Sequence, residues 1–270
     1  MRKLVVLTGI LCLVFGMAAV NQVSAIDVTV FDNLGAISDG TGIGYEKGET
    51  EPHTVPGAVW DLQSFNKLGT GADLSLKGGY DIKDGQSYSG TRYYSGNLFI
   101  ATPGTPWFGA ASPDLDYVGG TSGNAQITNN FGYNYVVQWE FTSATGGNYK
   151  VISIDENAIL KKTSYLTPET FLDTNPWRYV SDATDGAVVY NTGTFTFSEN
   201  SGIYELVLTN LLGLDEFKFA TSIWLYYTYQ CGNDIMAGHT FGSHAPLPPS
   251  ALLLGTGLLG LVGLRRFRKI

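Results

Sequence analysis

The stretch NYVVQWEF, residues 134–141, decides the class of fold that this chain can adopt. Its apolar residues recur at every second position: Tyr135, Val137, Trp139 and Phe141. Asn, Gln and Glu occupy positions between them. A period of two places the apolar set on one face of an extended strand, whereas a helix would need a period of 3.6. We therefore predict a half-buried β-strand whose other face is polar.

Further strands are predicted on both sides of this one. A turn is expected at Gly146–Asn148, with a hairpin partner over 149–154. Residues 217–230 are apolar on both faces, which is typical of a central strand buried on two sides. The remaining candidate strands are 27–31, 73–77, 97–101, 193–197 and 203–209. One helix is expected at 167–172, where Thr167 can cap the helix and Pro168 suits its first position.

Composition agrees with an all-β protein. Glycine supplies 34 of the 270 residues, well above the usual share of about 7%, which indicates many turns. No internal repeat or charge run divides residues 26–243. We predict a single antiparallel β-sandwich, jelly-roll-like, of roughly ten to fourteen strands. Greek-key and jelly-roll topologies are both compatible with the pattern.

The amino terminus has the form of a secretory signal peptide. Arg2 and Lys3 precede an apolar run over 4–20. Val23-Ser24-Ala25 then forms a cleavage site with small residues, of the kind that signal peptidase accepts. We expect cleavage after Ala25. The alternative, an uncleaved anchor helix, is disfavoured by that cleavage site.

The carboxyl terminus reads PLPPSALLLGTGLLGLVGLRRFRKI, residues 246–270. The 19 residues from Pro246 to Leu264 carry no charge, and as a helix they would span about 28 Å, near the thickness of a hydrocarbon core. Cations then follow, and such clusters stay on the cytoplasmic side of a membrane: Arg265, Arg266, Arg268 and Lys269. We predict a membrane-spanning segment that holds the body outside. The alternative is a buried C-terminal helix of the body.

The order of proline motif, apolar helix and arginine cluster resembles the PEP-CTERM sorting domain, over about 25 residues. The resemblance implies a surface or extracellular protein of an exopolysaccharide-producing Gram-negative bacterium, processed by an exosortase. It places Pro246, Leu247, Pro248 and Pro249 in the recognition motif, which here lacks the usual glutamate. The segment from Trp224 through Cys231-Gly232-Asn233-Asp234 also resembles the closing strand and turn of many proteins with this tail.

The charge balance restricts the partners of the body. Between residues 26 and 245 there are 24 acidic and ten basic residues, a net charge near −14. This acidity disfavours nucleic acid, whose recognition needs a basic surface. Cys231 is the only cysteine left once the signal peptide is removed, so we expect it to be buried rather than paired with another chain.

Catalytic motifs are weak. Asp114 with Asp116, and Asp155 with Glu156, are the candidate acid pairs for a glycosidase, but acids in such loops are usually solvated. No Glu-x-Asp-x-Glu or Gly-x-Ser-x-Gly pattern occurs, and the histidines at 53, 239 and 244 are interpreted as exposed linker residues. We predict no enzyme activity and no catalytic residues.

Two kinds of binding remain as weaker hypotheses. Asp81 and Asp84, before a Gly-rich turn, could bind Ca²⁺, although ordinary turn chemistry explains them equally well. Aromatic side chains in turn-rich contexts could stack on sugar rings, or could instead pack at the edge of the core. They are Trp60, Trp107, Trp177, Tyr93 and Tyr94.

The sequence therefore predicts three parts: a signal peptide (1–25), a β-sandwich body (26–243) and a sorting segment (244–270). The favoured function is that of an exported, non-enzymatic surface or matrix protein. It would be held in the inner membrane until an exosortase trims it, and would then join the exopolysaccharide or biofilm layer. The alternatives are a carbohydrate-binding module, which could depend on Ca²⁺, and a glycan-active enzyme.

Overall fold

The computed structural model describes residues 27–29, 57–104, 106, 117–120, 125–164, 176–180 and 188–240. Their strands are β1 (Asp27–Thr29), β2 (Leu62–Leu68), β3 (Asp73–Gly78), β4 (Gln86–Tyr88), β5 (Thr91–Tyr93), β6 (Leu98–Ala101), β7 (Tyr117–Gly119), β8 (Gln126–Thr128), β9 (Tyr135–Ser143), β10 (Gly146–Ser153), β11 (Ile159–Lys161), β12 (Arg178–Tyr179), β13 (Val188–Asn200), β14 (Ile203–Leu208), β15 (Ile223–Thr228) and β16 (Ile235–Thr240). The short helices are η3 (Leu211–Gly213) and α2 (Asp215–Lys218).

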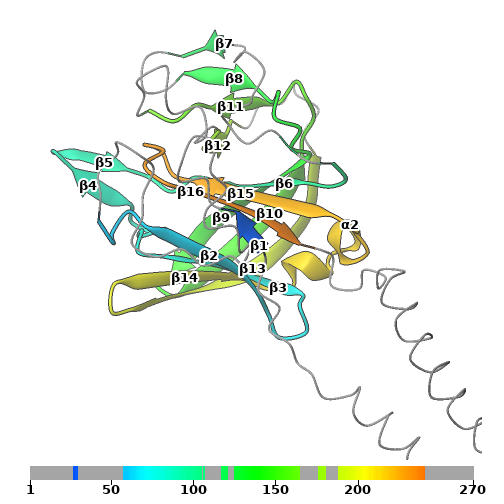
Figure 1. Ribbon diagram of the computed structural model, residues 1–270, viewed down its shortest axis with the longest axis horizontal. Helices are drawn as coiled ribbons and strands as arrows, with labels where there is room; N and C mark the ends of the chain where they lie inside the picture. Colours follow the sequence, from blue (N-terminus) through cyan, green and yellow to red (C-terminus); the bar gives the residue numbers. More distant parts are fainter. Residues whose placement is uncertain are drawn as a thin grey trace, which may run out of the picture.

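Ten strands form one antiparallel sheet in the order β1-β16-β15-β6-β9-β10-β13-β14-β3-β2 (Figure 1). The prediction of an all-β antiparallel fold is confirmed. The sequence analysis expected two facing sheets, whereas here the hydrogen bonds run continuously from β16 to β2, and these two strands come into contact. The sheet is thus nearly closed, like a barrel. Bulges at Gly146/Gly147, Val151/Ile152 and Leu62/Ser64 assist this curvature, because an extra residue bends and twists its strand.

Buried polar contacts join the two ends of the curled sheet. The Leu62 amide at the start of β2 donates to Asp234 Oδ2 at 2.6 Å, just before β16. The Tyr229 hydroxyl donates to the Trp60 carbonyl at 2.6 Å, and its ring stacks on Tyr80 with centroids 4.1 Å apart. The Cys231-Gly232-Asn233-Asp234 segment therefore lies at the seam of the sheet. Cys231 is buried and free, as the sequence analysis favoured.

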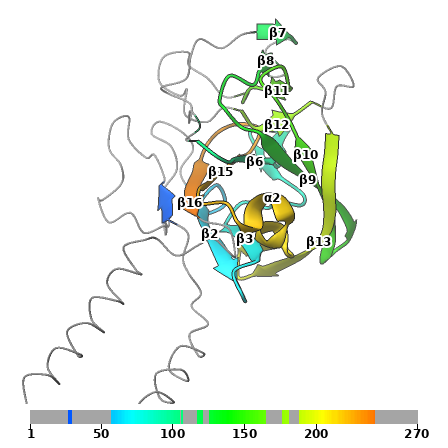
Figure 2. The same ribbon diagram turned by 90° about the vertical axis from the view of Figure 1, so that its right-hand side faces the viewer.

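The inside of the curled sheet holds the larger of two hydrophobic cores. Its buried side chains come from all around the sheet, for example Leu76 of β3, Val137 of β9, Leu206 of β14 and Leu225 of β15. The helices η3 and α2 lie across one end, where Phe217 is fully buried (Figure 2). One end of the sheet is therefore closed by apolar side chains of the chain itself.

A second core lies on the outer face of β6, β9, β10 and β15. A four-stranded sheet in the order β12-β11-β8-β7 covers this face, as Figure 1 shows above the main sheet. Val136 and Ile152 of the main sheet pack there with Ile127 and Leu160 of the small one. β15 is consequently buried on both faces, with Tyr227 in the larger core and Tyr226 in the smaller, which confirms the prediction of a central strand.

The predicted strands are found with shifted ends, and the predicted faces are correct for β9. Val137 is in the inner core, and Tyr135, Trp139 and Phe141 pack against it. The turn expected at 146–148 was wrong: the chain turns at 144–145, and Gly146 already belongs to β10. β2 and β16 were not predicted as strands, and α2 occupies the start of the strand expected at 217–230. The helix expected at 167–172 lies outside the described residues.

Candidate functional site

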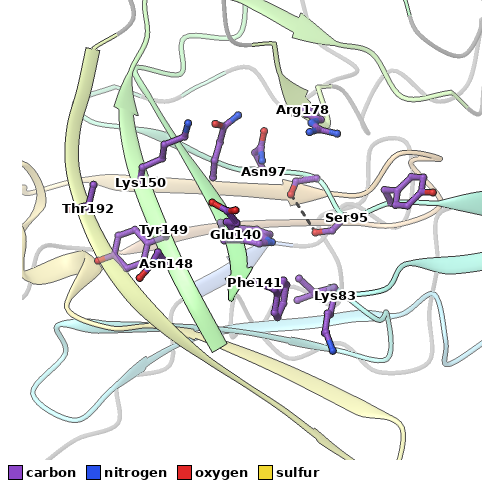
Figure 3. A pocket seen from close by; sticks show the side chains of 15 residues that line it. Lys83, Ser95, Asn97, Glu140, Phe141, Asn148, Tyr149, Lys150, Arg178 and Thr192 are labelled. Atoms are coloured by element: carbon purple, nitrogen blue, oxygen red, sulfur yellow. Dashed lines mark hydrogen bonds between the residues drawn. The ribbon is translucent and has the colours of Figure 1, made fainter. Parts of the chain in front are cut away.

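A hollow of about 510 Å³ opens where β6 separates from β9 (Figure 3). β6 pairs with β9 over three residues only, Leu98–Ile100 against 135–137. Upstream of β6 the chain turns away toward β12, since the Asn97 amide donates to the Trp177 carbonyl at 2.9 Å. From Gln138 onward β9 therefore has no strand partner on this side among the described residues. The hollow occupies the gap between this strand edge and residues 94–97.

The floor of the hollow is the outer face of β9, β10 and β13, while Trp139, Phe141 and Tyr149 line the hollow from the opposite, inner face of β9 and β10. Antiparallel register places Gln138 opposite Lys150, and Lys150 opposite Thr192, in one row across the three strands. Glu140 and Asn148 form the adjacent row. Farther along the same face the small sheet covers apolar residues of β9 and β10. The face is thus apolar where the small sheet covers it and polar where it does not.

Turns and loops distant in sequence supply the rim. Asp81 Oδ1 accepts the amides of Lys83 and Asp84, at 2.9 and 3.0 Å, and this turn positions Lys83. Gln230 Oε1 accepts the Tyr94 amide at 3.2 Å. Arg178 comes from β12, where its guanidinium carbon lies 5.8 Å from the centre of the Trp177 ring. The rim is therefore assembled from three separate parts of the chain, at 82–83, 94–97 and 178.

The lining carries an excess of positive charge. Lys83, Lys150 and Arg178 surround it, with Glu140 between them in the view of Figure 3. None of these four side chains forms a salt bridge with another residue that the structure describes. Cations that lack a carboxylate partner remain available to a ligand of opposite charge.

Aromatic side chains contribute to the same hollow. Tyr94, one of the aromatic residues proposed from sequence, lines it and is 53% exposed. Trp139 and Phe141 are partly buried and also line it, with the Trp139 ring 5.9 Å from that of Tyr227. Tyr149 is more deeply held: its hydroxyl donates to the Thr209 carbonyl at 2.8 Å, and burial raises its pKa to about 12. Trp139 was missed because its position on the core face of a strand indicated packing alone.

Of the three tryptophans proposed for carbohydrate stacking, the structure describes Trp60 and Trp177, and neither lines the hollow. Trp60 and Trp177 are 5% and 2% exposed, so their rings pack in the interior and present no face to a sugar. Their burial favours the alternative that the sequence also allowed, packing at the core. The reason is the closure of the sheet: Trp60 lies at the seam and contacts Tyr80 and Tyr229. Trp107 lies outside the described residues.

The calcium candidates have a structural role in the turn. The Asp81 carboxylate accepts two amides there, and Asp84 is exposed. In the described part of the chain, no three His, Cys, Asp or Glu side chains are grouped as metal ligands. The geometry of these residues therefore favours the turn chemistry that the sequence also allowed.

Asp155, Glu156 and His239 are not among the residues that line the hollow. Asp155 and Glu156 are exposed in the turn after β10, where Asp155 Oδ1 accepts the Asn157 amide at 2.8 Å. His239 was expected in a linker but lies on β16, partly buried, with its Nε2 3.3 Å from the Ser222 hydroxyl. Asp114, Asp116, His53 and His244 fall outside the described residues.

The sorting motif at 246–249 and the cations at 265–269 also lie outside the described residues, as does the signal peptide. Within the described ranges, no helix combines the length and the apolar character that a membrane span requires. Comparison with known proteins finds no matching family model, no matching curated protein and no matching solved structure.

Proposed function

We propose that this chain is an exported, non-enzymatic cell-surface or extracellular-matrix protein, held at the inner membrane by its C-terminal segment until that segment is processed. One observation carries the proposal. An uncharged stretch from Pro246 to Leu264 is followed at once by four cations, in a chain that begins with a signal-peptide pattern. The resemblance to the PEP-CTERM sorting domain adds an exosortase as the processing enzyme and the exopolysaccharide layer as the destination.

Fractionation of the producing bacterium tests this proposal. A chain that ends at Ser243 lacks the whole sorting segment but retains every residue that the structure describes. We expect the full-length chain at the outer surface, with its original C-terminus removed, and the truncated chain in the periplasm or the medium. Mass spectrometry of the surface-exposed material identifies its last residue. Equal distribution of the two chains, or surface material that still ends at Ile270, contradicts the proposal.

A matched control separates sorting from folding. Replacing the four tail cations by glutamine keeps the length and the proline motif but removes the charge that halts translocation. We expect this variant to lose retention at the membrane as the truncated chain does. Cys231, which is buried in the body, should remain inaccessible to thiol reagents in all three chains if the body is folded.

The second candidate function is carbohydrate binding by the body. The hollow beside β9 supports it, because the exposed ring of Tyr94 and the partly buried rings of Trp139 and Phe141 stand there beside amide and hydroxyl groups. Aromatic faces stack on sugar rings, and a few convergent polar groups fix the orientation of a ligand in such a pocket. This function is compatible with export, since a matrix protein must contact the matrix.

A further inference from the structure

We propose that the hollow beside β9 binds a glycan through a sugar that carries a carboxylate, as in an acidic polysaccharide. The proposal rests on the carbohydrate-binding function given above and specifies the ligand class of that site. A volume of about 510 Å³ lies in the range of about 300–1,000 Å³ that is usual for small-molecule pockets. It can therefore take a short stretch of a glycan chain rather than a folded partner.

The charged side chains that line the hollow are mostly positive, which indicates a negatively charged ligand. Residues 26–245 contain ten basic side chains, and three of them line the hollow. The same part of the chain contains 24 acidic side chains, and among the residues that the structure describes Glu140 is the only one of them that lines the hollow. The part of the chain from 26 to 245, whose net charge is near −14, thus has a positive site at the hollow. Such a site attracts an anion locally, although the molecule as a whole would repel it.

The three cations are suited to a carboxylate. Arg178 is exposed, and a guanidinium can donate two parallel hydrogen bonds to the two oxygens of one carboxylate. Lys150 stands in the floor beside Gln138 and Thr192, and Lys83 in the rim. Glu140 accepts hydrogen bonds only, so it can bind sugar hydroxyls and keeps the ligand carboxylate toward the cations.

The remaining lining groups favour a sugar over a peptide or a nucleic acid. Gln138, Asn148 and Thr192 offer amides and a hydroxyl, which can both donate to and accept from the hydroxyls of a pyranose. Tyr94 and Trp139 add ring surface. A nucleic acid carries a phosphate at every nucleotide, and the acidic surface beyond the hollow would repel these phosphates. Residues 94–97 stand opposite the open edge of β9 and limit the room for an added peptide strand.

Calorimetric titration of the full chain, purified in detergent, tests the proposal with matched sugars. The probes are oligosaccharides of galacturonic, glucuronic and mannuronic acid, their methyl esters, and the corresponding neutral oligosaccharides. Methyl esterification keeps the ring and its hydroxyls but removes the negative charge. We expect any acidic oligosaccharide that binds to do so about tenfold more tightly than its methyl ester. A hydrogen bond to a charged group contributes about 1.4 kcal/mol more than one between neutral groups, which corresponds to this factor.

Variants locate the binding. Arg178→Gln and Lys150→Gln should each weaken binding of the acid about tenfold and leave binding of the ester nearly unchanged. Arg92→Gln is the control, because Arg92 is also an exposed arginine on a short strand but does not line the hollow. Its removal changes the net charge equally and should have little effect. Equal weakening by Arg178→Gln and Arg92→Gln would mean that general charge, not the hollow, attracts the sugar, and overturns the proposal.

The outcomes distinguish the two levels of inference. If acids and esters bind equally, and Trp139→Ala weakens both, carbohydrate binding stands and the selection of acidic sugars is overturned. If no probe binds, both the ligand class and the carbohydrate-binding function are overturned. Neither result affects the export proposal, which depends on fractionation alone.

Discussion

At the scale of the residue, Asp234 joins the two ends of the main sheet. Its side chain is 2% exposed, and its two carboxylate oxygens accept the amides of Leu62 and Ile235 at 2.6 and 2.9 Å. Leu62 is 172 positions away in the sequence. The backbone carbonyl of Asp234 also accepts the Thr228 hydroxyl at 2.6 Å. A buried carboxylate that accepts amides in this way is costly to disturb, because its partners would lose their acceptor in a place without water.

We expect Asp234→Asn to lower the free energy of unfolding by about 2–4 kcal/mol, because the amide has one oxygen acceptor where the carboxylate has two. Urea denaturation at neutral pH measures the loss. Asp215→Asn is the control, since Asp215 is 83% exposed and its only ion pair among the described residues is with Lys218 at the surface. Surface pairs contribute under about 1 kcal/mol. Similar losses in the two variants would show that the Asp234 contacts do not hold the seam.

At the scale of the element, the hollow exists because β6 is short. The chain crosses over at Gly96, which is buried, and β6 then pairs with β9 through three residues only. A Cβ at Gly96 would lie 2.0 Å from the Thr228 carbonyl oxygen and 2.4 Å from that of Trp177. Only a residue without a side chain can pass so close to two backbones. Gly96 thereby determines where residues 94–97 stand relative to β9.

We expect Gly96→Ala to destabilise the fold by about 1–3 kcal/mol, because the added methyl group must displace the main chain of β15 or of the segment before β12. Thermal or urea unfolding measures the loss. In Gly119→Ala the new Cβ would meet only the flexible end of Gln126, at 3.6 Å, so this control should be nearly neutral. If Gly96→Ala is tolerated as well as Gly119→Ala, the close crossing is not rigid.

At the scale of the whole molecule, the two hydrophobic cores bury ionisable groups in their neutral forms. Burial raises the pKa of Cys231 and of Tyr149 to about 12, and that of Tyr133 and Tyr229 well above the ordinary value. A raised pKa means that the unfolded chain loses these protons first. The stability associated with each group is complete below its unfolded pKa and is lost as the pH rises toward its folded pKa.

We therefore expect the free energy of unfolding to fall from about pH 8.5, where an unfolded cysteine ionises, and more steeply above about pH 10, where unfolded tyrosines follow. Each fully buried group can contribute up to about 1.4 kcal/mol per pH unit. Urea titrations between pH 7 and 11 measure this. In Cys231→Ala the decline below pH 10 should disappear while the steeper part remains. A decline that persists unchanged in this variant would show that the thiol is not its cause.

The class of fold and several of its elements could be predicted from the sequence, because alternation in a strand is a local property. The faces of β9 and β14 follow from it, as does the double burial of β15. β16 was missed because Gly238 and His239 interrupt the pattern that marks a strand. The sheet order was not predictable, since hydrogen bonds between strands join residues as far apart as Leu62 and Asp234.

The candidate site depends on that long-range order. Asn97, Glu140 and Arg178 come from three segments whose sequences show no common signal, and they meet only because β6 leaves β9 beside β12. Packing of segments distant in the sequence also buries Trp60 and Trp177, which looked available when only neighbouring residues were considered. Periodicity and composition determined the antiparallel β-class by themselves, because they act between neighbours in the chain. Tertiary structure alone decided which side chains face water, because exposure depends on what the rest of the chain covers.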